Sequence, residues 1–331
     1  MKILYLTEQG CTVKKTSRRL VIVKDGKILN EVSIIGLDSV IVFGNIQLTT
    51  QVIASLLEAG IMVSFLSSGG KFRGILLPGN HKNVFLRISQ YERYLDDEFQ
   101  RTLASQIVLA KIGNGENLIM RHSKNHPEID FSQELTSIRR IKEKVKVKPP
   151  IPVLLGLEGS ATSAYFRAFR KMLHSKLEFT CRTKRPPKDP VNTLLSFGYS
   201  ILINEILSML FAVGFDPYIG YLHGIDYGRP ALALDVVEEY RHPIIDRLVL
   251  NLINRKVITE NDFSEDEEKG IILCKEGIKK YIENYELMFR EKCSLPKSGD
   301  SVTFRDLIRQ QVYKLSRTIM TRQEYTPFMF S

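Results

Sequence analysis

The chain has 331 residues and a mass of 37.9 kDa, more than one hydrophobic core usually organises, which predicts two domains. Hydrophobic residues make up 44% and charged residues 25%, so the composition excludes a wholly disordered chain. The formal net charge of +10 favours a polyanionic partner such as nucleic acid.

Four cysteines stand far apart and form no CxxC pair: Cys11, Cys181, Cys274 and Cys293. This pattern argues against a zinc ribbon, an iron–sulfur site and a secreted disulfide framework. The apolar run at the N-terminus is broken by Glu8, unlike the core of a signal peptide. No run approaches the ~20 apolar residues of a membrane span. We therefore expect a soluble, cytoplasmic protein with no membrane contact.

Residues 1–80 are predicted to form a small β-rich domain. Short β-branched runs such as RLVIVK, SVIVF and IMVSFL are separated by Gly, Asp, Asn and Ser turn residues. One helix is expected over residues 49–60, where Val52 and Leu56 share a face and Gly60 ends the helix. This helix would cover one sheet of a compact β domain.

The turn sequence Pro-Gly-Asn at residues 78–80 separates this domain from helical periodicity. We place the domain boundary near residues 79–84 and expect a larger, all-α C-terminal domain over 84–331. The fold class is therefore α+β with two domains. The first helical stretch of the second domain is predicted to end at Gly113 and Gly115.

A long apolar helix is expected between Asp189 and Gly214. Asp189 can cap it, Pro190 suits the first helical position and Gly214 closes it. Because this segment is apolar nearly all round, it should run through the core of the second domain.

Two charge runs are interpreted as solvated segments. Residues 139–148 are strongly basic and predict a helix end or linker, with a DNA contact as the alternative. Residues 260–268 hold six acidic residues and predict an exposed loop.

Glu158 is a candidate metal ligand because it lies in the apolar, small-residue segment LLGLEGSATSAYFRAF. A carboxylate in such surroundings is costly unless it is paired, protonated or bound to a cation. The alternative is an acidic residue in the first turn of a helix.

His223 lies in a loop, GFDPYIGYLHGIDYGRP, with apolar residues before it and Gly224 after it. These neighbours predict a fixed side chain. A structural histidine and a ligand both remain open.

Three acidic residues crowd the segment ALALDVVEEYRHPIIDRL. Asp235 and Glu238 are three apart and share a helix face, whereas Glu239 is next to Glu238. A divalent cation would relieve their repulsion, and a solvated acidic patch is the alternative. Carboxylates with one imidazole and no thiolate suit Mg²⁺ or Mn²⁺, which serve phosphoryl transfer on a phosphodiester.

Other chemistries lack their motifs. The sequence has no GxxxxGK[ST] phosphate loop and no GxSxG elbow. The remaining histidines stand beside polar or basic residues and are predicted to be surface positions or phosphate contacts: His81, His122, His126, His174 and His242.

Several blocks resemble the CRISPR adaptation integrase family, also called the CRISPR-associated endonuclease of spacer acquisition. These blocks are LEGSATSAYF, DPVNTLLSFGYSIL and GFDPYIGYLHGIDYGRPALALDVVEEYRHPIIDRLVLNLINRK, with a looser likeness in residues 40–76. The resemblance implies a β-rich N-terminal domain that mediates homodimerisation and a helical domain that holds the metal site.

The resemblance also implies the site residues. The family's glutamate falls on Glu158, its loop histidine on His223 and its helix acid on Glu238, with Asp235 as a supporting acid and possible ligand. Many relatives have aspartate as the third ligand, so Glu238 is a variant with a longer reach. The implied cofactor is Mg²⁺ or Mn²⁺.

Further positions fall in or beside the matching blocks. Three are expected near the site: Tyr165, Asn192 and Ser196. Helix packing is the alternative for Tyr165 and Ser196. Six basic residues are expected to line a phosphate track for DNA: Arg167, Arg170, Arg182, Lys184, Arg185 and Lys188.

The resemblance predicts a metal-dependent DNA integrase that joins the 3′-hydroxyl ends of short DNA fragments to a repeat array by transesterification. The expected partner is the small second CRISPR-associated adaptation protein. One alternative is a stand-alone, structure-selective nuclease that uses the same site with water. Another is a non-catalytic DNA-binding scaffold with a structural cation site.

Overall fold

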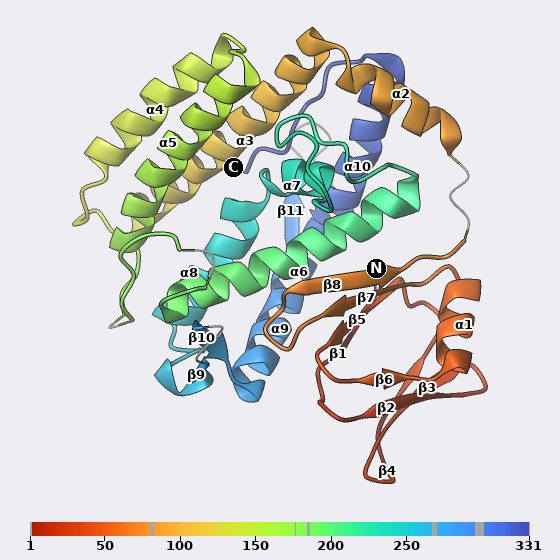
Figure 1. Cartoon of the computed structure of the whole chain (residues 1–331). Coiled ribbons are helices and arrows are strands. Elements are labelled where there is room, and N and C mark those ends of the chain that lie inside the picture. Colours follow the sequence, from red (N-terminus) through yellow and green to blue (C-terminus); the bar gives the residue numbers. More distant parts are fainter. Residues whose placement is uncertain are drawn as a thin grey trace. The chain divides into compact units, whose positions relative to one another are not determined.

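The computed structural model describes residues 2–79, 83–175, 177–183, 186–266, 270–294 and 301–330 (Figure 1). The chain divides into two compact units, Met1–Lys82 and Asn83–Ser331. The first unit is rich in strands and the second is mostly helical. The predicted α+β fold class is confirmed.

The described part of the N-terminal unit contains two four-stranded sheets. The first has the order β1 (Ile3–Leu6), β5 (Ser39–Phe43), β7 (Met62–Leu66) and β8 (Phe72–Leu76). Strands β1, β5 and β7 are parallel, and β8 is antiparallel to β7. The second has the order β4 (Lys27–Ser33), β3 (Arg19–Lys24), β2 (Thr12–Thr16) and β6 (Gln47–Leu48).

Helix α1 (Thr50–Glu58) packs into the core of this unit. The Thr49 side chain caps it by accepting from the Val52 N–H, and Val52 and Leu56 are fully buried, as the apolar spacing predicts. They join a core with β-strand residues such as Val40 of β5. Gly60 follows at φ +74°, a conformation that favours glycine.

The described part of the helical unit contains long helices, short helices and two hairpins. Its longer helices are α2 (Val84–Tyr94), α3 (Asp97–Asn125), α4 (Ser132–Lys146), α5 (Ile151–Lys171), α6 (Pro190–Val213), α9 (Lys275–Arg290) and α10 (Phe304–Thr321). Its short helices are α7 (Ala231–Val237), α8 (Arg247–Asn254), the π-helical turn η1 (Arg241–Asp246) and the 3₁₀ turn η2 (Glu260–Asp262).

The hairpins were not predicted from the sequence. They pair β9 (Phe263–Asp266) with β10 (Gly270–Leu273) and β11 (Lys292–Ser294) with β12 (Ser301–Thr303). The acidic segment expected as an exposed loop therefore contributes η2 and β9. In a strand of only four residues, the alternation of polar and apolar residues is too short to distinguish the strand from a loop.

The prediction that Gly113 and Gly115 end a helix is wrong. Helix α3 continues through both residues to Asn125. A Cβ at Gly115 would lie 3.0 Å from Tyr165 and 3.1 Å from His242, so this position needs a residue without a side chain. The glycines therefore permit close packing inside a helix, at a modest cost in helix propensity.

Helix α6 has the predicted caps and runs through the middle of the helical unit (Figure 1). The Asp189 side chain accepts from the Asn192 N–H, and Gly214 ends the helix at φ +104°. Contrary to the sequence prediction, α6 is long and apolar enough to span a membrane, with a mean hydropathy of 1.6. However, 72% of that window is buried inside the unit, as in the core helix of a globular domain.

The segment after α7 turns sharply and separates neighbouring acidic residues. Glu238 lies at the end of α7, and the π-helical turn that follows contains Pro243, which lacks a backbone N–H. Glu238 and Glu239 consequently point to different surroundings. The predicted solvated patch is wrong, because Asp235, Glu238 and Glu239 are all buried.

Glu239 anchors the C-terminal segment. Its carboxylate accepts from the Tyr325 hydroxyl at 2.5 Å and from the Phe328 N–H at 2.7 Å. Asn114 of α3 donates to the carbonyls of Glu239 and Phe328 and accepts from the Phe330 N–H. The tail thus satisfies buried polar groups of α3 and of the turn after α7.

Burial raises the pKa of Glu239 to about 7, although Tyr325 and the Phe328 N–H oppose the shift. Between pH ~4.5 and ~7, Glu239 is therefore protonated in the folded protein and ionised in the unfolded chain. We expect the free energy of unfolding to fall across this window as pH rises, and Glu239→Gln to remove about 3 kcal/mol of that dependence.

Urea denaturation of both proteins at pH 5 and pH 8 measures this difference. Glu143→Gln, on the exposed face of α4, is the matched control and should keep the wild-type dependence. An identical pH dependence for wild type and Glu239→Gln would contradict the assignment.

Candidate metal centre

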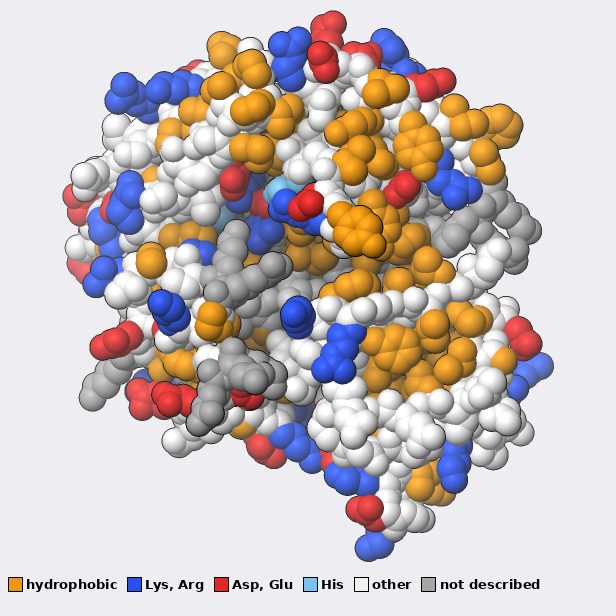
Figure 2. Space-filling view, viewed as in Figure 1, with side chains coloured by type: hydrophobic (Ala, Val, Ile, Leu, Met, Phe, Trp, Pro, Cys, Tyr) orange, Lys and Arg blue, Asp and Glu red, His pale blue; other side chains and the backbone are white. Residues whose placement is uncertain are grey.

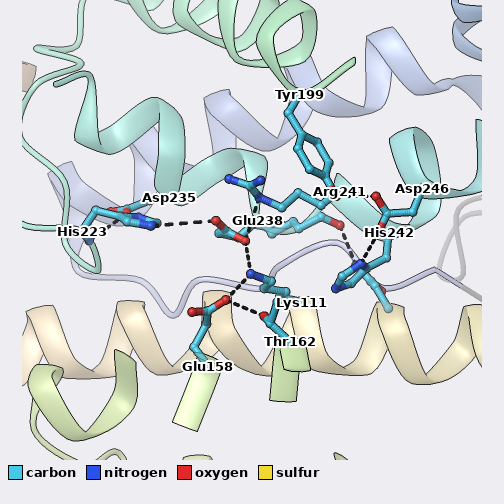
Figure 3. Close-up of polar contacts among 12 residues, drawn as sticks. Lys111, Glu158, Thr162, Tyr199, His223, Asp235, Glu238, Arg241, His242 and Asp246 are labelled. Atoms are coloured by element: carbon cyan, nitrogen blue, oxygen red, sulfur yellow. Dashed lines mark hydrogen bonds and ion pairs between the residues drawn. The ribbon is translucent and has the colours of Figure 1, made fainter. Parts of the chain in front are cut away.

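A buried lysine joins two of the predicted ligands. The Lys111 ammonium of α3 contacts Glu158 Oε1 and lies 2.6 Å from Glu238 Oε2 (Figure 3). The side chains of Lys111 and Glu238 are 7% and 4% exposed, whereas that of Glu158 is 20% exposed. The two carboxylates thus converge on one positive charge at the edge of the core.

Glu158 lies two turns into α5, so the alternative of a first-turn carboxylate is wrong. Thr162, one turn later, donates to Glu158 Oε1 at 2.8 Å and fixes the carboxylate. A Cβ at Gly159 would meet no atom within 4 Å, so the helix surface beside Glu158 is open. In Figure 2, acidic, basic and histidine side chains meet at the surface in this part of the helical unit.

Asp235 holds His223 in a defined orientation. Asp235 Oδ1 lies 2.7 Å from His223 Nδ1 and accepts the His223 N–H at 3.0 Å. Its Oδ2 accepts the N–H groups of Tyr221 and Leu222. The other imidazole nitrogen, Nε2, lies 3.9 Å from Glu238 Oε1. The loop histidine therefore presents Nε2 to Glu238 (Figure 3).

These contacts distinguish Asp235 from the other acids. Both of its oxygens are engaged and the residue is fully buried. A carboxylate that orients a histidine in this way is typical of the shell behind metal ligands. The geometry thus supports Asp235 as a positioning residue rather than a direct ligand.

Positive neighbours keep the two glutamates ionised. Burial alone would raise the pKa of Glu238, but Arg241, Lys111 and His223 lower it to about 2. Burial also opposes ionisation of Glu158, and Lys111 nevertheless lowers its pKa. Both side chains are therefore anionic acceptors at neutral pH.

Lys111 and Arg241 were not predicted from the sequence. Arg241 Nε lies 3.0 Å from Glu238 Oε2, and its guanidinium stacks 4.5 Å from the centre of the Tyr199 ring. Lys111 stands in the apolar run IVLAKIG, where a buried charge requires a partner. The sequence therefore indicates that Lys111 needs an anionic partner. It does not indicate which one, because Glu158 and Glu238 belong to other segments of the chain.

Asn192 and Ser196 form a second layer around Arg182. Asn192 Oδ1 accepts from Arg182 at 2.8 Å, and Ser196 Oγ accepts from it at 2.9 Å. Arg182 also stacks on Tyr199, which connects this layer to Arg241. Arg182 thus contacts residues of its own unit, and its predicted phosphate contact stays a prediction.

Tyr165 packs behind the centre. Its ring lies 3.8 Å from that of His242, whose Nδ1 is 2.7 Å from Asp246. Burial and the Asp246 carboxylate raise the pKa of the Tyr165 hydroxyl, which stays neutral. His242 is 3% exposed, so its predicted surface position is wrong.

The other predicted basic residues differ in accessibility. Arg167, Arg170 and Lys188 are exposed. Lys184 and Arg185, like His81, lie outside the described residues. Arg167 and Arg170 on α5 and Lys188 before α6 are therefore the exposed members of the predicted phosphate track that the structure describes.

The donor set fits a divalent cation. Glu158 and Glu238 offer carboxylate oxygens and His223 offers an imidazole nitrogen. This combination suits Mg²⁺ or Mn²⁺. The Lys111 ammonium stands in for such a cation between the two carboxylates. The site thus combines two converging carboxylates with an open surface next to α5.

Comparisons with known proteins place this chain among CRISPR-associated nucleases and integrases. Residues 4–287 match the family described as CRISPR associated protein Cas1. CRISPR-associated endonuclease Cas1 3 of Thermus thermophilus is 33% identical over 98% of this chain and 94% of its own length. The chain belongs to the Cas1 family.

Solved structures agree with this assignment. A casposase bound to its integration product matches with a TM-score of 0.86 and 26% identity, covering 100% of this chain and 95% of the casposase. A Cas6-RT-Cas1–Cas2 complex matches with a TM-score of 0.85 and 28% identity. That match covers 99% of this chain and 36% of the larger one.

Replacing Lys111 by methionine tests the buried charge cluster. We expect Lys111→Met to lower the free energy of unfolding in EDTA by about 3–5 kcal/mol, because two carboxylates lose their shared partner. The exposed Lys124 on the same helix provides the control variant Lys124→Met.

Chemical denaturation measures both variants. In the background of Glu158→Gln the effect of Lys111→Met should shrink, since one of the two anions is already neutral. Equal losses in the two backgrounds would refute the coupling between Lys111 and Glu158.

Proposed function

We propose that this protein is a metal-dependent DNA integrase of CRISPR adaptation. It joins the 3′-hydroxyl ends of short foreign DNA fragments to the repeat array by transesterification. The observation that carries the proposal is that Glu158 and Glu238 meet at the Lys111 ammonium in a Cas1-family chain, with His223 Nε2 3.9 Å from the other oxygen of Glu238. The likeness to a casposase bound to an integration product supports joining as well as cutting.

Each residue has a defined task in this proposal. Glu158, His223 through Nε2, and Glu238 would hold Mg²⁺ or Mn²⁺. The bound ion would neutralise a phosphate oxygen, activate the attacking hydroxyl and stabilise the leaving oxygen. Asp235 orients His223, and Arg241 fixes Glu238. Lys111 competes with the ion for the carboxylates and keeps the site neutralised without it.

The partners follow from charge and surface. The net charge of +10 and the exposed Arg167, Arg170 and Lys188 favour double-stranded DNA and the CRISPR repeat. The Cas1–Cas2 complex among the structural relatives supports Cas2, the small second adaptation protein, as a partner. We place the enzyme in the cytoplasm, without membrane contact.

The proposal includes a homodimer formed through the N-terminal unit. Strand β4 lies at the edge of its sheet. Two of its apolar residues are exposed to solvent, Ile28 by 61% and Leu29 by 50%. An apolar edge strand is a surface that a second copy can cover.

Strand transfer of a labelled duplex into supercoiled plasmid, with Cas2, tests the proposal. We expect joined product with Mn²⁺ or Mg²⁺, none with EDTA, and loss of product for Glu158→Gln, His223→Ala and Glu238→Gln. The exposed Glu143 provides the control Glu143→Gln, which should retain activity.

The same assay separates the alternatives. Metal-dependent cutting without joined product would support the stand-alone nuclease and refute integration. Unchanged DNA processing by the three variants would support the non-catalytic scaffold, with its cation site purely structural.

Asp235→Asn tests the positioning role separately. The amide keeps the shape but cannot accept every hydrogen bond that the carboxylate does, so His223 loses its fixed orientation. We expect strand transfer to fall by roughly 10–100-fold, with a matching loss of Mn²⁺ affinity in calorimetry. A metal affinity equal to that of wild type would contradict this role.

A further inference from the structure

Three histidines that the proposed catalytic centre does not use meet at the far end of α3. His122 lies on the last turn of that helix, His126 is its C-cap residue, and His174 follows α5. One ligand atom from each lies within 4.8 Å of the others. Ring centroids are 4.4 Å apart for His122 and His126 and 4.6 Å apart for His126 and His174.

The fold holds this cluster in place. Asn254, at the end of α8, accepts the His174 N–H at 2.9 Å and donates to the Met172 carbonyl at 2.8 Å. His126 Nδ1 lies 3.2 Å from Glu128. With the proton on Nδ1, that contact leaves Nε2 of His126 free to bind a metal.

His122 lacks a partner for one of its nitrogens. Its Nε2 is buried and makes no hydrogen bond to any residue that the structure describes. Burial and the neighbouring His126 and His174 lower the pKa of His122 to about 4, so the ring is neutral at pH 7. A neutral imidazole offers a lone pair to a metal, whereas it offers no positive charge to a phosphate.

We propose that His122, His126 and His174 form a second metal site that binds Zn²⁺. Three imidazoles without a carboxylate ligand suit a borderline transition metal and disfavour Mg²⁺ or Mn²⁺. Glu128 behind His126 matches the carboxylate–histidine arrangement of zinc sites. The fourth position is left for water, because His174 is exposed.

This site is distinct from the centre around Lys111. His122 is eleven residues further along α3, which corresponds to about 16 Å along the helix axis. The metal would link the end of α3 to the chain segment that follows α5. It would therefore stabilise the helical unit without touching the proposed catalytic ligands.

Titration of the full-length protein with Zn²⁺ in excess Mg²⁺ tests the proposal by calorimetry, with Co²⁺ absorption as a second readout. We expect about one Zn²⁺ per chain and a tetrahedral Co²⁺ spectrum. His174→Ala should abolish both signals, and Glu128→Gln should weaken binding by roughly 10–100-fold. Lys124→Ala, an exposed neighbour on α3, should bind like wild type.

Thermal unfolding provides an independent check. Zn²⁺ should raise the melting temperature of wild type and His223→Ala but not that of His174→Ala, which replaces an exposed side chain outside the core. Absence of Zn²⁺ binding by wild type, or equal binding by His174→Ala, would overturn the proposal. Loss of binding in His223→Ala alone would assign the zinc to the Lys111 centre instead.

Discussion

The helical unit depends on the pairing of buried charges around Lys111. Two glutamates from separate helices are held ionised at the edge of a hydrophobic core, and each would be costly there alone. The ammonium offsets that cost and Arg241 adds a second positive charge to Glu238. The cluster therefore holds two ionised carboxylates close together while the unit stays folded.

The same constraint explains the residues behind the centre. Asp235 accepts three successive backbone N–H groups and contacts the imidazole of His223, so one carboxylate fixes both the loop and the His223 side chain. The turn after α7 then sends Glu238 toward Lys111 and Glu239 toward the C-terminal segment. Adjacent acids thus serve different parts of the unit, one at the site and one in the anchoring of the tail.

Helix α3 connects these features through its composition. Gly115 allows Tyr165 and His242 to approach the helix closely, Lys111 supplies the central charge and Asn114 binds the tail. A helix that contributes polar groups on several sides must satisfy all of them from neighbouring segments. This explains why glycines that read as helix ends are instead internal packing positions.

The sequence by itself determined the α+β class, the cap-to-cap extent of α1 and α6, and the residues Glu158, His223 and Glu238 as candidates. Helix caps and hydrophobic periodicity can be read from neighbouring residues, which predicts the helices. The family blocks are contiguous stretches of sequence, which identifies the candidate residues. Only the tertiary structure decided that Lys111 and Arg241 neutralise the acids and that Asp235 stands behind His223. It also gave Arg182 partners in its own unit and brought His174 to His122 and His126. Most of these contacts join residues from different helices or loops, and no local pattern specifies which buried charge or imidazole will meet which partner.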